Sequence, residues 1–241
     1  MKKLYDKNEL LFALTWIGVY VVGFSAADGL SSALGIEKLL TALLGAVLTG
    51  VLLTFLRKNG LMAKCGLVKG SYNARQYLYF VPLLVLASTN FWNGATMNLP
   101  LPEAALYVLS MIWVGILEEV IFRGLLFTAM RKDSLKWAVA VSSLTFGFGH
   151  IVNLLNGAEL LATLLQVVYA TAAGFLFTVM FLKSGSLLPC ILTHCAINSF
   201  SAFGVEGSKT LDMITAAVLT VVAVLYALWI LKKEPPAEGN G

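Results

Sequence analysis

Long runs of apolar residues, nearly free of charge, constrain most strongly how this chain can fold. Hydrophobic residues make up 59% of the chain and Asp, Glu, Lys and Arg only 12%, roughly half the charged fraction of an average soluble domain. A helix that crosses a bilayer needs roughly 20 mostly apolar residues. Eight stretches approach this length, namely 10–27, 39–56, 77–92, 104–130, 137–151, 160–182, 187–203 and 211–231. The sequence therefore predicts an all-α, polytopic membrane bundle of eight transmembrane helices, of which the fifth and seventh are short.

Basic residues between these stretches indicate the topology. If the connections alternate across the membrane, fourteen Lys and Arg residues share the side of the N-terminus, and two, Lys38 and Lys209, lie on the other side. The positive-inside rule then places both termini in the cytoplasm. Topology therefore explains the net charge of +4, and we expect a lipid bilayer around the protein and no nucleic-acid partner.

The chain divides into one large domain and a short tail. Residues 1–231 are expected to form a single integral membrane domain, and the polar tail 232–241 has too few apolar residues to fold by itself. Cys65, Cys190 and Cys195 form neither a paired framework nor a CxxC pattern. Neither disulfides nor a thiolate metal site are therefore expected.

A few ionisable side chains interrupt the apolar stretches. Glu118, Glu119 and Arg123 lie in the fourth stretch, and the only two histidines, His150 and His194, lie in the fifth and seventh. A charged group at the centre of a bilayer costs at least roughly 2.5–3.5 kcal/mol on insertion scales. Such groups usually face the interior of a bundle, find partners there and mark a functional site.

Helical spacing separates the roles of these residues. Glu119 and Arg123 are one turn apart, so they can pair. Glu118 points about 100° away from Glu119 and remains free for another neighbour. Asn198 follows His194 by one turn and shares its face. One carboxylate is therefore expected to be structural and the other to be available for chemistry.

The fifth stretch ends in the sequence FGFGH, residues 146–150. Gly147 and Gly149 are expected to let a neighbouring helix approach closely. His150, the last residue of this sequence, would then lie where two helices meet.

Two kinds of hydrolytic site are compatible with these side chains. In the first, Glu118 takes a proton from water as a general base, and His194 and Asn198 donate hydrogen bonds to the oxyanion of a scissile carbonyl. In the second, Glu118, His150 and His194 hold a divalent metal such as zinc, since two His and one Glu form a known catalytic zinc set. Both possibilities remain open, so the cofactor is either none or a divalent metal.

Three short motifs resemble a known family. EEVIFR (118–123), FGFGH (146–150) and HCAIN (194–198) fit the patterns EExxxR, FxxxH and HxxxN. In this order, on successive apolar stretches, they resemble the CPBP family of intramembrane proteases. That family includes type II CAAX prenyl endopeptidases and bacterial relatives linked to bacteriocin immunity. The motif core is expected within residues 104–203.

The resemblance implies a fold, an activity and a set of roles. It implies an eight-helix core, an intramembrane cavity that opens toward the cytoplasm, a bacterial cell membrane as the location, and peptide hydrolysis by glutamate-activated water. The substrate would be a peptide or a membrane protein, and the oligomeric state stays open. By the resemblance, Glu118 is the base, Glu119 and Arg123 are the supporting pair, and the water and oxyanion are held by His150, His194 and Asn198.

Two other functions remain as alternatives. A transporter or channel would use Glu118, Glu119 and Arg123 as an ion relay, but the repeated halves or broken helices common in transporters are not recognisable in the sequence. A catalytically silent immunity or binding protein would retain the same scaffold. The intact motifs favour a protease over both.

Overall fold

The computed structural model describes residues 1–70, 80–205 and 207–233, which form helices joined by loops, with no β-strand among them. The long helices are α2 (Glu9–Leu34), α3 (Leu39–Lys58), α5 (Leu101–Glu119), α7 (Leu135–Gly149), α9 (Leu160–Ser184) and α11 (Lys209–Lys233). The short helices are α1 (Lys2–Lys7), α4 (Val81–Ser88), α6 (Thr128–Met130), α8 (Val152–Leu155) and α10 (Leu188–Phe200). Two 3₁₀ turns, Thr89–Phe91 and Ser201–Phe203, and the π-helix Val120–Phe127 complete the secondary structure of the described residues. The all-α class is therefore confirmed.

Six helical segments of the described residues are long and apolar enough to cross a membrane. They are Glu9–Leu34, Leu39–Lys58, Leu101–Met130, Leu135–Leu155, Leu160–Ser184 and Lys209–Lys233. Two shorter apolar segments, Val81–Phe91 and Leu188–Phe203, fall below that length. The prediction of eight spanning helices is thus supported for six segments.

One predicted stretch is corrected by the structure, and another lies partly outside the described residues. The fifth stretch is not short, because α7 continues through one turn into α8 and the segment Leu135–Leu155 reaches 21 residues. The third predicted stretch, 77–92, begins outside the described residues, and most of the predicted tail also lies outside them. The seventh stretch is short, as expected.

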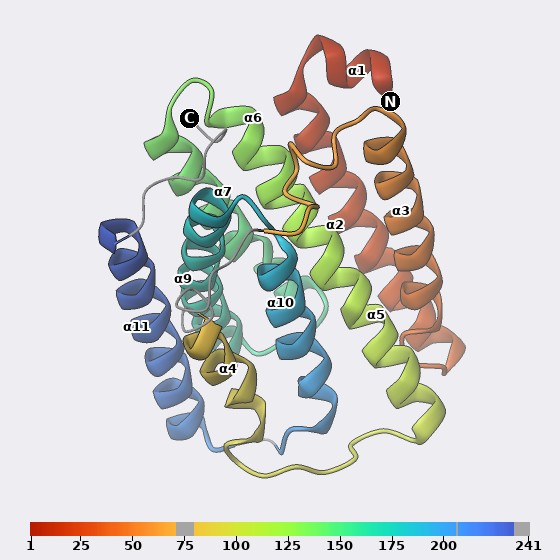
Figure 1. Ribbon diagram of the computed structural model, residues 1–241. Coiled ribbons are helices and arrows are strands. Elements are labelled where there is room, and N and C mark those ends of the chain that lie inside the picture. Colours follow the sequence, from red (N-terminus) through yellow and green to blue (C-terminus); the bar gives the residue numbers. More distant parts are fainter. Residues whose placement is uncertain (71–79, 206, 234–241) are drawn as a thin grey trace.

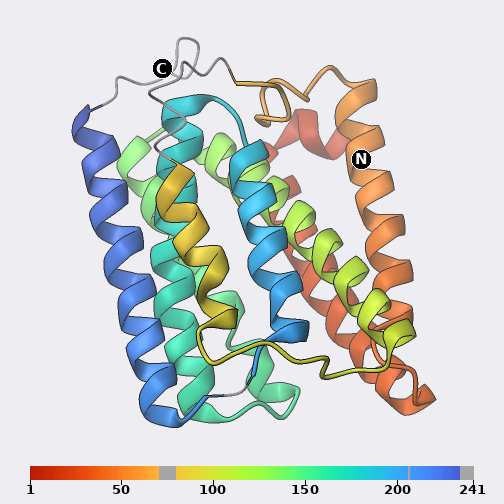
Figure 2. The same ribbon diagram turned by 60° about the horizontal axis from the view of Figure 1, so that its bottom comes forward.

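The helices alternate in direction, so the bundle has two distinct ends (Figures 1 and 2). One end, which we call the terminal end, holds α1, the α6–α7 connection, the α9–α10 connection and the end of α11. The other, which we call the distal end, holds the α2–α3 connection, the loop before α5, helix α8 and the loop before α11. The two ends of the described chain therefore lie on the same side of the bundle.

Apolar side chains cover the outside of the bundle as well as its interior. Val22, Leu84 and Leu192 are each 69–70% exposed, although all lie within apolar helices. A helix that is hydrophobic on all faces is typical of a membrane span. The fold is that of an integral membrane protein, with lipid as the neighbour of these outer faces.

A glycine brings α7 directly against α9. A Cβ on Gly147 would overlap with Thr171 Oγ1 and lie 2.8 Å from the carbonyl oxygen of Val167. Gly149 was expected to act in the same way, but a Cβ there would meet no described atom within 4 Å. The prediction of close helix approach is therefore right for Gly147 and wrong for Gly149, because Gly149 faces away from α9.

The change Gly147→Ala should lower the thermal unfolding midpoint, and Gly149→Ala should not. The added methyl group at residue 147 has no space between α7 and α9, and overpacking of this kind costs about 1–3 kcal/mol. Thermal unfolding of the two purified variants in the same detergent measures the difference. Equal midpoints for both variants would contradict the close contact at Gly147.

Candidate active site

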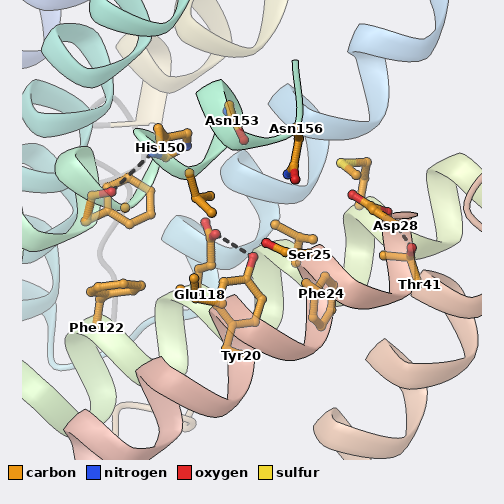
Figure 3. Close-up of a pocket in the computed structure, with 16 residues that line it drawn as sticks. Tyr20, Phe24, Ser25, Asp28, Thr41, Glu118, Phe122, His150, Asn153 and Asn156 are labelled. Atoms are coloured by element: carbon orange, nitrogen blue, oxygen red, sulfur yellow. Dashed lines mark hydrogen bonds between the residues drawn. The ribbon is translucent and has the colours of Figure 1, made fainter. Parts of the chain in front are cut away.

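Glu118, in the last turn of α5, is buried and makes two contacts with other helices. Its Oε1 accepts a hydrogen bond from the Tyr20 hydroxyl of α2 at 2.6 Å, as Figure 3 shows. Its Oε2 lies 3.4 Å from His194 Nε2 of α10 and has no hydrogen-bond partner among the described residues. One oxygen of this carboxylate is therefore held in place, and the other is available.

Glu119 has a different set of partners from Glu118, as helical spacing predicts. Its Oε1 accepts hydrogen bonds from Arg123 Nη1 at 3.1 Å and from His194 Nδ1 at 2.9 Å. Glu119 and Arg123 are both fully buried. The predicted Glu119–Arg123 pair is present, and the same carboxylate also binds the imidazole.

The Glu119 contact determines how His194 presents its second nitrogen. A carboxylate at Nδ1 favours a proton on that nitrogen, because a carboxylate only accepts hydrogen bonds. Nε2 of the neutral ring is then a proton acceptor, and it faces Glu118 Oε2 at 3.4 Å. His194 thus connects the two carboxylates.

The guanidinium of Arg123 lies among aromatic rings. Its Cζ is 4.2 Å from the centroid of Phe146 and 5.8 Å from that of Phe177. A Cβ on Gly174 would come within 2.9 Å of Arg123 Nη2, so a glycine gives this side chain its space. Burial of a charge without its counter-ion is strongly unfavourable, so Glu119 and the two rings together stabilise Arg123.

A second glycine, Gly115, allows α5 to pack closely against α10. A Cβ on Gly115 would lie 2.7 Å from Cys195 Sγ and 2.9 Å from its backbone nitrogen. The Cys195 thiol donates to the carbonyl oxygen of Ile112 at 3.4 Å. Because His194 precedes Cys195, this contact brings the imidazole beside the two glutamates one turn further along α5.

A cavity of about 130 Å³ extends from Glu118 between α2, α3, α5, α7 and α8 (Figure 3). The residues at its inner end, Glu118, Phe122 and Phe146, are buried, whereas Asn156 at its outer end is exposed. The complete lining is Tyr20, Val21, Phe24, Ser25, Asp28, Thr41, Met111, Val114, Glu118, Phe122, Phe146, Gly149, His150, Val152, Asn153 and Asn156. The available oxygen of Glu118 therefore belongs to a side chain that lines a cavity with both polar and apolar walls.

The outer end of this cavity is at the distal end of the bundle. It is formed near the C-terminal end of α2, the start of α3 and helix α8. The sequence analysis expected termini in the cytoplasm and an opening toward the cytoplasm. These two expectations are incompatible, because the chain ends and the cavity opening lie at opposite ends of the bundle.

His150, at the C-terminal end of α7, lines the same cavity as Glu118. Its Nδ1 is 3.1 Å from the carbonyl oxygen of Phe146, so Nδ1 donates the hydrogen bond and Nε2 remains available. The rings of His150 and His194 both pack edge-on to Phe146, at centroid distances of 5.5 and 5.6 Å. Phe146 therefore packs against both imidazoles.

The structure does not bring all predicted site residues together. Asn198 is half-buried on α10 and is not among the described residues that line the cavity. Glu118, His150 and His194 were a predicted metal set, yet the described residues contain no group of three or more His, Cys, Asp or Glu arranged to hold a metal ion. The described geometry therefore does not fit that metal set.

Residues 100–200 match the family model described as Type II CAAX prenyl endopeptidase Rce1-like. This segment is Rce1-like. The match begins with α5, ends with α10 and contains all three motifs. It overlaps the predicted motif core 104–203 and bears out the resemblance to CPBP and CAAX proteases. No curated protein and no solved structure gives a significant match to the chain.

Sequence reasoning missed several residues of this site. Tyr20 lies 98 positions before Glu118 and outside the matched segment, and its only sequence signal is a hydroxyl within an apolar helix. Asn153 and Asn156, also in the cavity wall, follow the FGFGH motif and lie between two of the predicted apolar stretches. The π-helix Val120–Phe127 has no recognisable pattern, although π-turns are frequent at functional sites.

Proposed function

We propose that the chain is an intramembrane endopeptidase in which Glu118 activates water for attack on a peptide bond. The observation that carries this proposal is the available oxygen of the buried Glu118, a side chain that lines the cavity and lies beside His194 within an Rce1-like segment. An ionisable group in hydrocarbon is costly, and a cavity that admits water and peptide accounts for it. The lipid bilayer and a peptide or membrane-protein substrate are the partners that this function requires.

The steps follow from the side chains that line the cavity. Glu118 accepts a proton from a water molecule, and the water oxygen attacks the carbonyl carbon of the scissile bond. His150 Nε2, when protonated, donates a hydrogen bond to the resulting oxyanion. Glu118 then gives the proton to the leaving nitrogen as the carbon–nitrogen bond breaks. His194 shares the proton with Glu118 between these steps, and Glu119 keeps its ring in position.

Two assigned roles remain proposals without a described contact. The amide of Asn198, one turn from His194 on α10, would donate a hydrogen bond to the oxyanion. The described residues contain no cluster of three His, Cys, Asp or Glu that could hold a divalent metal, and the steps above use side chains and water alone. A chelator in the assay below tests the metal directly.

The experiment is peptide cleavage by the purified full-length chain, followed by mass spectrometry of the products. The panel contains a farnesylated peptide with a CAAX terminus, the same peptide without the lipid, and an apolar peptide with a polar C-terminal extension. Cleavage of at least one peptide is expected. If the protein binds these peptides but cleaves none of them, the endopeptidase proposal is overturned and a catalytically silent binding protein is favoured.

Incubation with a chelator is expected to leave cleavage unchanged, because the mechanism above uses only side chains and water. The measurement is the initial rate before and after removal of divalent metals. A rate that falls by tenfold or more and recovers on addition of zinc would show that Glu118, His150 and His194 rearrange around a metal.

The change Tyr20→Phe should lower kcat about tenfold while leaving KM nearly unchanged. The hydroxyl hydrogen bond to a carboxylate is worth roughly 1.5–3 kcal/mol, and its loss frees Glu118 to rotate. Tyr107→Phe is the matched control, since its hydroxyl also has a side-chain partner, Ser201 at 2.9 Å, far from Glu118. Equal losses in both variants would mean that Tyr20 does not position Glu118.

A further inference from the structure

The π-helix Val120–Phe127 begins directly after the two glutamates of the site and contains Arg123. Backbone hydrogen bonds of a π-helix join residues five positions apart, and such helices are rare and mostly limited to a single turn. This one is eight residues long and joins α5 to α6. Because the π-helix leads from Glu119 to Arg123, the contacts that hold its backbone also affect the buried pair of these two residues.

Two buried hydroxyl groups donate hydrogen bonds to carbonyl oxygens of this π-helix. Thr128 Oγ1, from the next residue of the same segment, donates to the carbonyl oxygen of Arg123 at 3.1 Å. Ser142 Oγ, from the neighbouring helix α7, donates to the carbonyl oxygen of Phe122 at 2.9 Å. A carbonyl oxygen has two lone pairs, so it can accept such a bond in addition to a backbone bond. Ser142, which is 0% exposed, therefore links α7 to the backbone of the π-helix.

Ser142 belongs to a face of α7 that also carries two residues of the site. Phe146 and His150 follow it at intervals of four residues, so the three side chains lie along one face. The Phe146 ring packs edge-on against the Phe122 ring at a centroid distance of 5.4 Å and lies 4.2 Å from Arg123 Cζ. His150 lines the same cavity as Glu118. The face of α7 that contacts the π-helix therefore continues into the cavity.

The hydrogen bond from Ser142 differs in kind from the apolar contacts around it. Apolar contacts are non-directional, so the packed rings of Phe146 and Phe122 allow one helix to shift slightly against the other. A hydrogen bond weakens steeply when its geometry changes. This one joins a side chain of α7 to a backbone atom one helical turn beyond Glu118. It therefore fixes the position of α7 along the helix that carries Glu118.

We propose that Ser142 is a positioning residue of the active site, whose hydrogen bond to the Phe122 carbonyl holds α7 in register with the π-helix. The inference rests on the proposed endopeptidase function, in which Glu118 activates water and His150 binds the oxyanion. Both of these side chains line one cavity, and their separation depends on the register of α7. A misplacement of about 1 Å can cost about a hundredfold in rate. Ser142 thus acts on the reaction through the position of His150.

The neighbouring Ser143 provides a matched control. Its hydroxyl donates to the carbonyl oxygen of Val139 within α7 at 2.7 Å, and its residue is only 4% exposed. Ser143→Ala therefore removes a buried hydroxyl from the same helix and leaves the hydrogen bond between Ser142 and Phe122 in place.

Steady-state kinetics of the purified variants test the effect on the reaction, with a peptide that the unaltered chain cleaves. Ser142→Ala should lower kcat about tenfold and change KM less than about twofold, whereas Ser143→Ala should keep the full rate. Ser142→Cys, which retains a weak donor, should recover part of the loss. An unchanged kcat in folded Ser142→Ala, or equal losses in Ser142→Ala and Ser143→Ala, would overturn the inference.

Amide hydrogen exchange, followed by mass spectrometry, tests the contact without requiring cleavage. Ser142→Ala should speed exchange in peptides that cover Val120–Phe127 by about five- to tenfold, as expected for the loss of one hydrogen bond, and Ser143→Ala should not. If Ser142→Ala does not fold, Ser142→Cys replaces it in both measurements, with smaller effects of the same sign. Unchanged exchange in this segment would overturn the inference. If the unaltered chain cleaves no peptide, the proposed function fails, and the exchange rates still decide whether Ser142 holds the π-helix.

Discussion

The change Glu118→Gln should lower peptide hydrolysis at least about a thousandfold, within the range of 10²–10⁴ typical of a general base. Glutamine keeps the shape of the side chain and can still accept the Tyr20 hydrogen bond, but its amide cannot take a proton from water. His194→Ala should cause a loss of similar order, because it removes the partner that shares the proton with Glu118. The measurement is the initial rate of product formation at saturating peptide.

A control separates this loss from unfolding. Glu37→Gln makes the same chemical change in an exposed residue at the distal end and should retain the full rate. Glu118→Gln should also keep the thermal unfolding midpoint of the unaltered protein, because the hydrogen bond to Tyr20 survives the change. Undiminished turnover by folded Glu118→Gln would refute the role of Glu118 as the base.

The change Glu119→Ala should destabilise the protein by about 3–5 kcal/mol, the usual cost of removing one partner of a buried ion pair. It leaves the guanidinium of Arg123 without its carboxylate and removes the acceptor of His194 Nδ1. Unfolding in detergent, followed by circular dichroism against denaturant, measures the loss. Activity should fall as well, since the imidazole loses its orientation.

The double change Glu119→Leu with Arg123→Met tests whether the lost stability of Glu119→Ala comes from the unpaired charge of Arg123. Replacing a buried pair by apolar side chains of similar volume is often neutral or stabilising. The double variant should therefore be more stable than Glu119→Ala and still nearly inactive. An unfolding midpoint of Glu119→Ala equal to that of the unaltered protein would show that Arg123 does not depend on Glu119.

Sequence reasoning succeeded where a residue's surroundings follow from helical spacing. The pairing of Glu119 with Arg123 and the separate orientation of Glu118 both depend on positions within one helix, and both are confirmed. The membrane character also follows directly, because apolar runs of this length have no stable position in water. These features need no knowledge of how the helices pack.

Features that depend on packing between helices could not be predicted from one sequence. Tyr20 reaches Glu118 only because α2 crosses α5, and Gly149 differs from Gly147 only because one faces α9 and the other does not. Spacing within one helix likewise could not show that Phe146 of α7 packs against His194 of α10. The expected eight spans depended on counting apolar residues, which cannot separate a spanning helix from a short helix such as α10.

The shared use of Glu119 by Arg123 and His194 constrains how this scaffold could lose its activity over evolution. A mutation of Glu118 removes the base and leaves the Glu119–Arg123 pair intact, so the folded bundle survives as an inert protein. A mutation of Glu119 leaves the buried guanidinium of Arg123 without its carboxylate. Proteins that carry this mutation are therefore prone to misfold until Arg123 is also replaced. Inactive descendants of such a protein are therefore expected to have lost the first glutamate of the EExxxR pattern and to have kept the second.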